Sequence, residues 1–137
     1  MNTRIDAISK TCVEESISRI VARKFEPKIS IPPIGYPYGY IVGFQQKWRG
    51  NSLTLYSLFK CDAPKAIFKD YEREYAKITW NSPDSYSLWY MRPKPKEYWY
   101  KQHSNLTLAE ALGAIEFENV FHPRLWYTIK RGHEHRP

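Results

Sequence analysis

The residues best suited to chemistry in this sequence are aromatic and basic, and they gather in SLWYMRPKPKEYWYKQ, residues 87–102. The segment contains Trp89, Trp99 and three tyrosines among several lysine and arginine residues. Rings flanked by cations stack bases and neutralise phosphates in several nucleic-acid-binding modules. Rings are also large building blocks for a small core, since each buries roughly 150–250 Å². The segment therefore has two interpretations, a binding surface or part of the core of a small sheet.

Residue patterns that would support catalysis or metal binding are weak. Glu97 is followed two places later by Trp99, and Glu74 is one residue out of step with Lys77, so neither gives the acid-x-lysine spacing of metal-dependent nucleases. The histidines of 133–135 have no clear further metal ligands nearby. No phosphate-binding G-x-x-x-x-G-K motif is present. We expect a non-catalytic protein without a cofactor or metal, and a small nuclease or hydrolase is the less favoured alternative.

Length and charge set the general class. The 137 residues predict a single domain over 1–127, followed by a flexible basic tail at 128–137. The formal net charge of +7 favours anionic partners such as nucleic acid or acidic proteins. The first ten residues lack the pattern of a secretory signal, and no apolar run is long enough to span a membrane. We therefore expect a cytoplasmic protein with no membrane contact.

Helical spacing predicts a helix over about 3–24, with Thr3 and Asp6 as a capping pair and Pro27 near its end. Its apolar stripe makes Cys12 a buried small hydrophobe. The stripe consists of Ile5, Ile8, Cys12, Val13, Ile17, Ile20 and Val21.

Alternating patterns predict five strands, the first two joined by a hairpin turn at 49–51. Residues 61–74 break the alternation and predict a loop. The capping box that begins at Thr107 and includes Glu110 opens a second helix, which ends near Glu118. The predicted strands are 38–48, 52–60, 75–80, 86–91 and 97–102.

These elements predict an α+β fold, in which a five-stranded, largely antiparallel sheet carries the N-terminal and C-terminal helices on one face. Strand alternation sorts the side chains onto two faces. The helix side should carry Tyr40, Val42, Phe44, Trp48, Leu53, Leu55, Phe59, Ala76, Ile78, Trp80, Tyr86, Leu88, Tyr90, Tyr98 and Tyr100. The opposite side should carry Tyr75, Lys77, Thr79, Ser87, Trp89, Met91, Glu97, Trp99 and Lys101.

The mixed face, on which Trp89 should lie between Lys77 and Trp99 of the neighbouring strands, gives the candidate binding surface. Its residues would hold nucleic acid, or another acidic partner, by stacking and charge neutralisation. Cross-strand tryptophan pairs also stabilise sheets by themselves, and residues 61–74 or the chain around Trp126 could fold over them. A protein-interaction or homo-oligomerisation surface anchored by the tryptophans is the alternative function. The candidate residues are Trp89, Trp99, Lys77, Lys101, Arg92, Lys94 and Lys96.

Several segments together resemble a known family. They are AKITW (76–80), SYSLWY (85–90), EYWY (97–100) and LTLAEALGAIEFENVF (106–121). The pattern resembles a family of small bacterial proteins classed as a domain of unknown function, number three-zero-two-four. Glu118-Asn119 departs from the acid and proline that are usual there. The resemblance covers roughly residues 40–121 and implies the same α+β fold, but it carries no activity and no functional residue.

Overall fold

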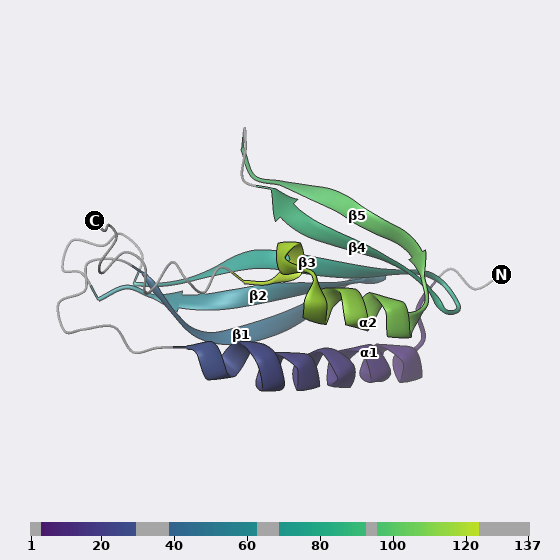
Figure 1. Ribbon diagram of the computed structural model, residues 1–137, viewed down its shortest axis with the longest axis horizontal. Coiled ribbons are helices and arrows are strands. Elements are labelled where there is room, and N and C mark those ends of the chain that lie inside the picture. The colour runs from purple at the N-terminus through teal and green to yellow at the C-terminus, as the bar shows by residue number, and fades with distance from the viewer. Residues whose placement is uncertain (1–3, 30–38, 63–68, 93–95, 124–137) are drawn as a thin grey trace.

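The computed structural model describes residues 4–29, 39–62, 69–92 and 96–123. It confirms the α+β prediction, with one antiparallel sheet in the order β1-β2-β3-β4-β5 and two helices (Figure 1). The predicted tail at 128–137 lies outside the described residues, so its flexibility stays a prediction.

The first helix, α1, runs from Ala7 to Ile20. Asp6 is its N-cap, and the Asp6 carboxylate accepts a 2.6 Å hydrogen bond from the backbone N–H of Ser9. Asp6 is therefore the N-cap, and Thr3, the partner predicted for it, lies outside the described residues. The chain continues as a π-helical turn, Val21–Phe25, and a 3-10 turn, Glu26–Lys28.

The structure contradicts the predicted burial of Cys12, whose side chain is exposed. Two apolar rows run along α1, and only one of them can face the sheet. Val13 and Ile17 belong to the buried row. Ile8 and Cys12, one turn apart, belong to the outer row, and Ile8 is 83% exposed.

The strands β3, β4 and β5 are longer than predicted, and β3 begins within the predicted loop at 61–74. Asp70 pairs with Lys60, and Glu74 pairs with Tyr56, so the start of β3 extends the sheet beside β2. The five strands are β1 Tyr40–Arg49, β2 Ser52–Lys60, β3 Asp70–Ser82, β4 Ser85–Arg92 and β5 Tyr98–Leu106.

Two tight turns of the sheet each contain a residue with a positive φ. Gly50 has a φ of 59° in the β1–β2 turn, a value that glycine adopts without steric cost. Asp84 has a φ of 55° in the β3–β4 turn. Its Oδ1 also accepts a 3.1 Å hydrogen bond from the N–H of Leu108, which joins this turn to the start of the second helix.

The second helix, α2, runs from Leu108 to Phe117 and begins with the predicted capping box. The Thr107 hydroxyl accepts a hydrogen bond from the N–H of Glu110, and the Glu110 carboxylate accepts one from the N–H of Thr107. A 3-10 turn, Asn119–Phe121, follows the helix and buries Phe121 completely. The C-terminal helix is therefore held at both ends.

Two β-bulges change which side chains face the helices. The register between β2 and β3 shifts beside Leu55, so Tyr75 and Ala76 are both buried in the core. Tyr75 therefore does not lie on the face predicted for it. A second bulge in β1 buries Ile41 opposite Phe59 and leaves Val42 50% exposed, which reverses the prediction for Val42.

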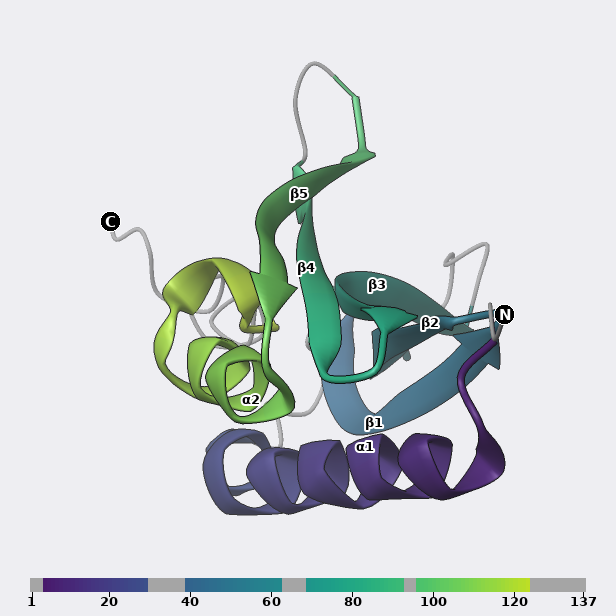
Figure 2. The ribbon, with the colours of Figure 1, turned by 90° about the vertical axis from the view of Figure 1, so that its right-hand side faces the viewer.

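Both helices lie on one face of the sheet, as predicted (Figures 1 and 2). The core lies between them and the sheet, and Leu88 is completely buried there. Figures 1 and 2 also show the β4–β5 hairpin extending beyond the helices. Tyr98 and Tyr100 consequently remain 41% exposed each, although the alternation had assigned them to the core face.

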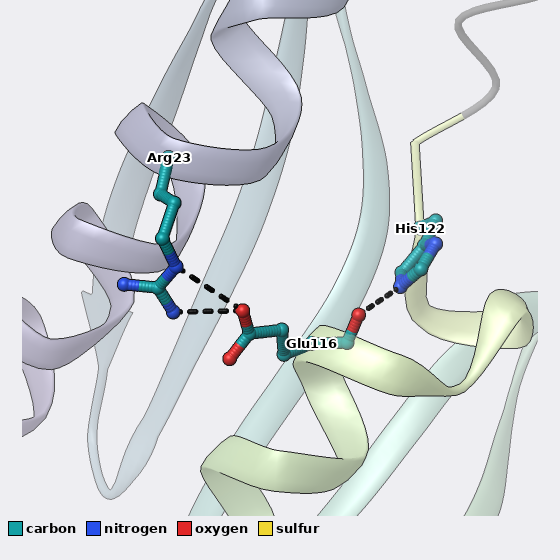
Figure 3. A network of polar contacts seen from close by, with 3 residues as sticks. All are labelled: Arg23, Glu116 and His122. Carbon is teal, nitrogen blue, oxygen red and sulfur yellow. Dashed lines mark hydrogen bonds and ion pairs between the residues drawn. The ribbon is translucent and has the colours of Figure 1, made fainter.

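A polar network joins the ends of the two helical segments (Figure 3). Arg23 Nη2 and Nε lie 2.8 and 3.2 Å from Glu116 Oε2, and His122 Nε2 donates to the Glu116 carbonyl at 2.8 Å. The His122 ring also packs on Phe25, with ring centroids 5.1 Å apart. Burial, supported by the charges of Lys24 and Lys28, lowers the pKa of His122 below its ordinary value of 6.5.

We predict that His122 makes the fold sensitive to acid. Because its folded-state pKa is lowered, its stabilising contribution is complete above pH 6.5. That contribution is lost as the pH falls through the folded-state pKa, since the unfolded chain takes up the proton more readily. His122→Gln keeps an N–H donor without a titrating ring. Lowering the pH from about 7.5 to about 5.5 should therefore reduce the free energy of unfolding of the parent protein more than that of the variant. Urea unfolding at both pH values measures the two losses. Equal losses would contradict this role.

Candidate nucleic-acid interface

The sheet face turned away from the helices, here called the distal face, gathers two indoles and two lysines. Its residues are Lys77 and Thr79 of β3, Ser87, Trp89 and Met91 of β4, and Trp99 and Lys101 of β5. The alternation of side chains along the strands puts them on one side because the pleat has a period of two.

The register places Trp89 at the centre of this group. Trp89 pairs with Lys77 on β3 and with Lys101 on β5. Trp99 lies opposite Met91, two residues away from the predicted partner position beside Trp89. A shift of two residues preserves the facing of every side chain, so the predicted face is right although the predicted register is wrong.

The ammonium group of Lys77 contacts both indoles. Its Nζ lies 4.7 Å from the ring centroid of Trp89 and 4.6 Å from that of Trp99, while Lys101 Nζ lies 5.2 Å from Trp89. Each such contact is worth about 0.5–2 kcal/mol, depending on how far the cation is desolvated. Burial lowers the pKa of Lys77, and the nearby charge of Glu74 partly opposes this.

The edge of the Trp89 ring is fixed by the sheet itself. Its indole N–H donates to Thr79 Oγ1 at 3.1 Å, and the Thr79 hydroxyl lies 2.8 Å from Ser52 Oγ. This chain of contacts crosses three adjacent strands, β2, β3 and β4. Because the only polar group of the indole is already satisfied, a ligand would meet Trp89 through its apolar ring.

Charges elsewhere on the distal face are paired within the protein. Lys47 forms a 2.7 Å ion pair with Glu72 and lies 4.7 Å from the ring centroid of Tyr56. Among the ion pairs of the described residues, by contrast, none includes Lys77 or Lys101. The cations beside the two indoles are therefore held by rings rather than by carboxylates.

The predicted loop cations do not all join this group. Arg92 pairs with Tyr98 and lies over the ring of Tyr100, 5.0 Å from its centroid, on the helix-side face. Lys96 is exposed just before β5, and Lys94 lies outside the described residues. The structure thus brings together Trp89, Trp99, Lys77 and Lys101, and separates Arg92 from them.

One contributor was missed from the sequence. Thr79 was placed on the correct face, but nothing in the pattern indicated that its hydroxyl would orient Trp89. The signal that could have found it is its register position: Thr79 pairs with Ser87, and this is the next pair on the same face after Lys77 and Trp89. The sequence also suggested that residues 61–74, or the chain around Trp126, fold over the two indoles. Most of these residues, 63–68 and 124–137, lie outside the described residues, so this stays a prediction.

Comparison with known protein families gives a match over most of the chain. The model of the family described as "Domain of unknown function (DUF3024)" matches residues 3–123. The chain belongs to this family. The DUF3024 match spans both helices and the whole sheet, which extends the resemblance noted from shorter segments to the entire described fold. No curated protein and no solved structure matches the chain.

No group of three or more His, Cys, Asp or Glu side chains within the described ranges is arranged to hold a metal ion. None of the helices in those ranges is both long enough and apolar enough to cross a bilayer.

Proposed function

We propose that this protein is a non-catalytic binding module that holds nucleic acid on its distal face. One observation carries the proposal. Two indoles and two lysine ammonium groups without carboxylate partners among the described ion pairs form a single group on the face that the helices leave uncovered. Bases would stack on the rings, and the ammonium groups would neutralise phosphates.

Fixed geometry supports stacking as the mode of contact. Hydrogen bonding to Thr79 holds the Trp89 ring before any ligand arrives, so little side-chain entropy would be lost on binding. Lys77 lies beside both rings and so would meet the phosphate of a nucleotide stacked there. The net charge of +7 would raise the local concentration of a polyanion around the whole protein.

A protein-interaction module remains the second candidate, because Trp89, Trp99 and Met91 are residue types enriched at protein interfaces. That function predicts a defined oligomer or hetero-complex that buries both indoles and depends weakly on salt. Light scattering together with the salt titration below separates the two functions.

We predict that Lys101→Gln weakens binding of a fluorescent oligothymidylate several-fold and reduces the slope of log affinity against log salt by about one. Fluorescence anisotropy at several salt concentrations measures both quantities. Lys10→Gln is the matched control, since it also removes one cation that lies 5.2 Å from an indole, that of Trp48 on the helix side. Equal effects of the two substitutions, or an affinity independent of salt, would count against the proposal.

A further inference from the structure

The helix-side face of the β4–β5 hairpin carries a second aromatic and basic patch, formed by Arg92, Tyr98 and Tyr100. Both tyrosines are 41% exposed, because the hairpin extends beyond the two helices (Figures 1 and 2). Neither ring is accounted for by the core or by the distal face.

The patch is anchored to the core by ring contacts. Tyr100 meets Tyr90 edge-on with centroids 5.5 Å apart, and Tyr90 meets the buried Phe121 at 6.2 Å. The Arg92 guanidinium lies over Tyr100, 5.0 Å from the ring centroid. The patch therefore offers a supported ring and a planar cation, which is the combination that stacks nucleobases in single-strand-binding proteins.

Its charge suits an anionic partner. Arg92 is exposed on the patch, and Lys96 is exposed two residues before Tyr98. The adjacent carboxylate, Glu97, is already paired with Arg73 of β3. A phosphate chain passing the end of the hairpin would thus meet cations without an uncompensated acid beside them.

The two faces meet at β5, which is the edge strand of the sheet among the described strands. Along β5 the residues Tyr98, Trp99, Tyr100 and Lys101 point alternately to the helix side and the distal side. Successive Cα atoms are only about 3.8 Å apart. One flexible chain turning around this edge could contact rings on both faces.

We infer that the ligand is single-stranded nucleic acid, which wraps around the edge of β5 and stacks on both the distal-face indoles and the Tyr98–Tyr100 patch. The inference rests on the proposed function and narrows it. A duplex fits poorly for two reasons: its bases are already stacked on each other, and its stiffness, with a persistence length of about 150 base pairs, prevents such a turn.

The test uses Tyr98→Ala combined with Tyr100→Ala in the full chain. The probes are fluorescent oligothymidylates of about 6 and about 20 nucleotides, around the range of site sizes for one small domain, and a DNA hairpin duplex. Losing two stacking rings should weaken binding of the longer strand by at least about fivefold. The shorter strand, which reaches one face only, should be affected less. Tyr98→Phe with Tyr100→Phe should bind normally because the rings remain.

Each other outcome overturns the inference. If the tyrosine variant binds the longer strand normally while Trp89→Ala with Trp99→Ala does not, the wrap is wrong and the proposed function stands. Equal affinity for the duplex and the single strand would also show that the wrap is wrong, while the proposed function stands. If neither pair of substitutions changes binding, both proposals fail. A change in oligomeric state with unchanged affinity would make the patch a self-association surface. Thermal unfolding checks that every variant is folded.

Discussion

Alanine at both Trp89 and Trp99 is expected to weaken single-strand binding by at least about thirtyfold, since each stacked base is worth about 1–3 kcal/mol. The expectation follows from the group on the distal face, where Lys77 lies within 5 Å of both ring centroids. Loss of both rings removes the stacking surface and also leaves Lys77 without the contacts that place it. Fluorescence anisotropy with an oligothymidylate measures the change.

A parallel variant separates lost stacking from general damage. Phenylalanine at both positions keeps a ring on each strand but removes the indole N–H that Trp89 donates to Thr79. We expect its affinity to lie between those of the parent and the alanine variant. If the folded alanine variant binds the oligothymidylate with an affinity within twofold of that of the parent, the distal face is not the binding surface.

Phe121→Ala is expected to destabilise the fold by about 3–5 kcal/mol, the usual cost of truncating a fully buried phenylalanine. Phe121 is completely buried and makes ring contacts with Tyr90 at 6.2 Å and His103 at 6.0 Å. The turn that carries it thereby joins the end of α2 to the sheet. Urea unfolding followed by circular dichroism gives the free energy of unfolding.

The chain provides a matched control for this prediction at the end of α2. Phe117 is 72% exposed and makes one cation–π contact, with Lys24 Nζ at 4.8 Å from the ring centroid. Phe117→Ala should therefore cost less than about 1 kcal/mol. If both substitutions cost the same, α2 and its following turn are not packed as described.

Much of this fold follows from local sequence patterns. The capping box at Thr107 and Glu110 marks the start of α2 because its two side chains satisfy backbone N–H groups that the helix leaves unpaired. The run of β-favouring residues after the hairpin turn gives the bounds of β2, Ser52–Lys60, as predicted. The facing of Lys77, Trp89 and Lys101 follows from the same period of two.

The errors arise where tertiary geometry overrides the local period. A bulge admits one extra residue and so interrupts the alternation of side chains at that point, which is how Tyr75 enters the core and Val42 leaves it. Cys12 was misplaced because α1 has two apolar rows and the sequence does not say which one meets the sheet. The exposure of Tyr100 depends on how far the β4–β5 hairpin extends beyond α2. The periodicity of the sequence does not predict this length.

The candidate site was predictable as a face but not as a set of contacts. Strand alternation brings both indoles to the same side as two lysines, yet it does not show that Lys77 contacts both rings or that Thr79 orients Trp89. Arg92 was also grouped with the distal face, because it was taken as part of the loop that follows the predicted strand 86–91 and not as the last residue of the strand. Its pairing with Tyr98 puts it on the other side.

Nuclear magnetic resonance of the indole N–H signals during titration with an unlabelled oligothymidylate tests the central claim most directly. Signals are assigned by single phenylalanine substitutions. We predict that the chemical shifts of the Trp89 and Trp99 signals change as ligand is added and level off at saturation. Those of Trp48, which bonds Glu14 on the helix side, and of the buried Trp80 should stay in place. Movement confined to Trp48 and Trp80, or no movement at Trp89 and Trp99, would contradict binding on the distal face.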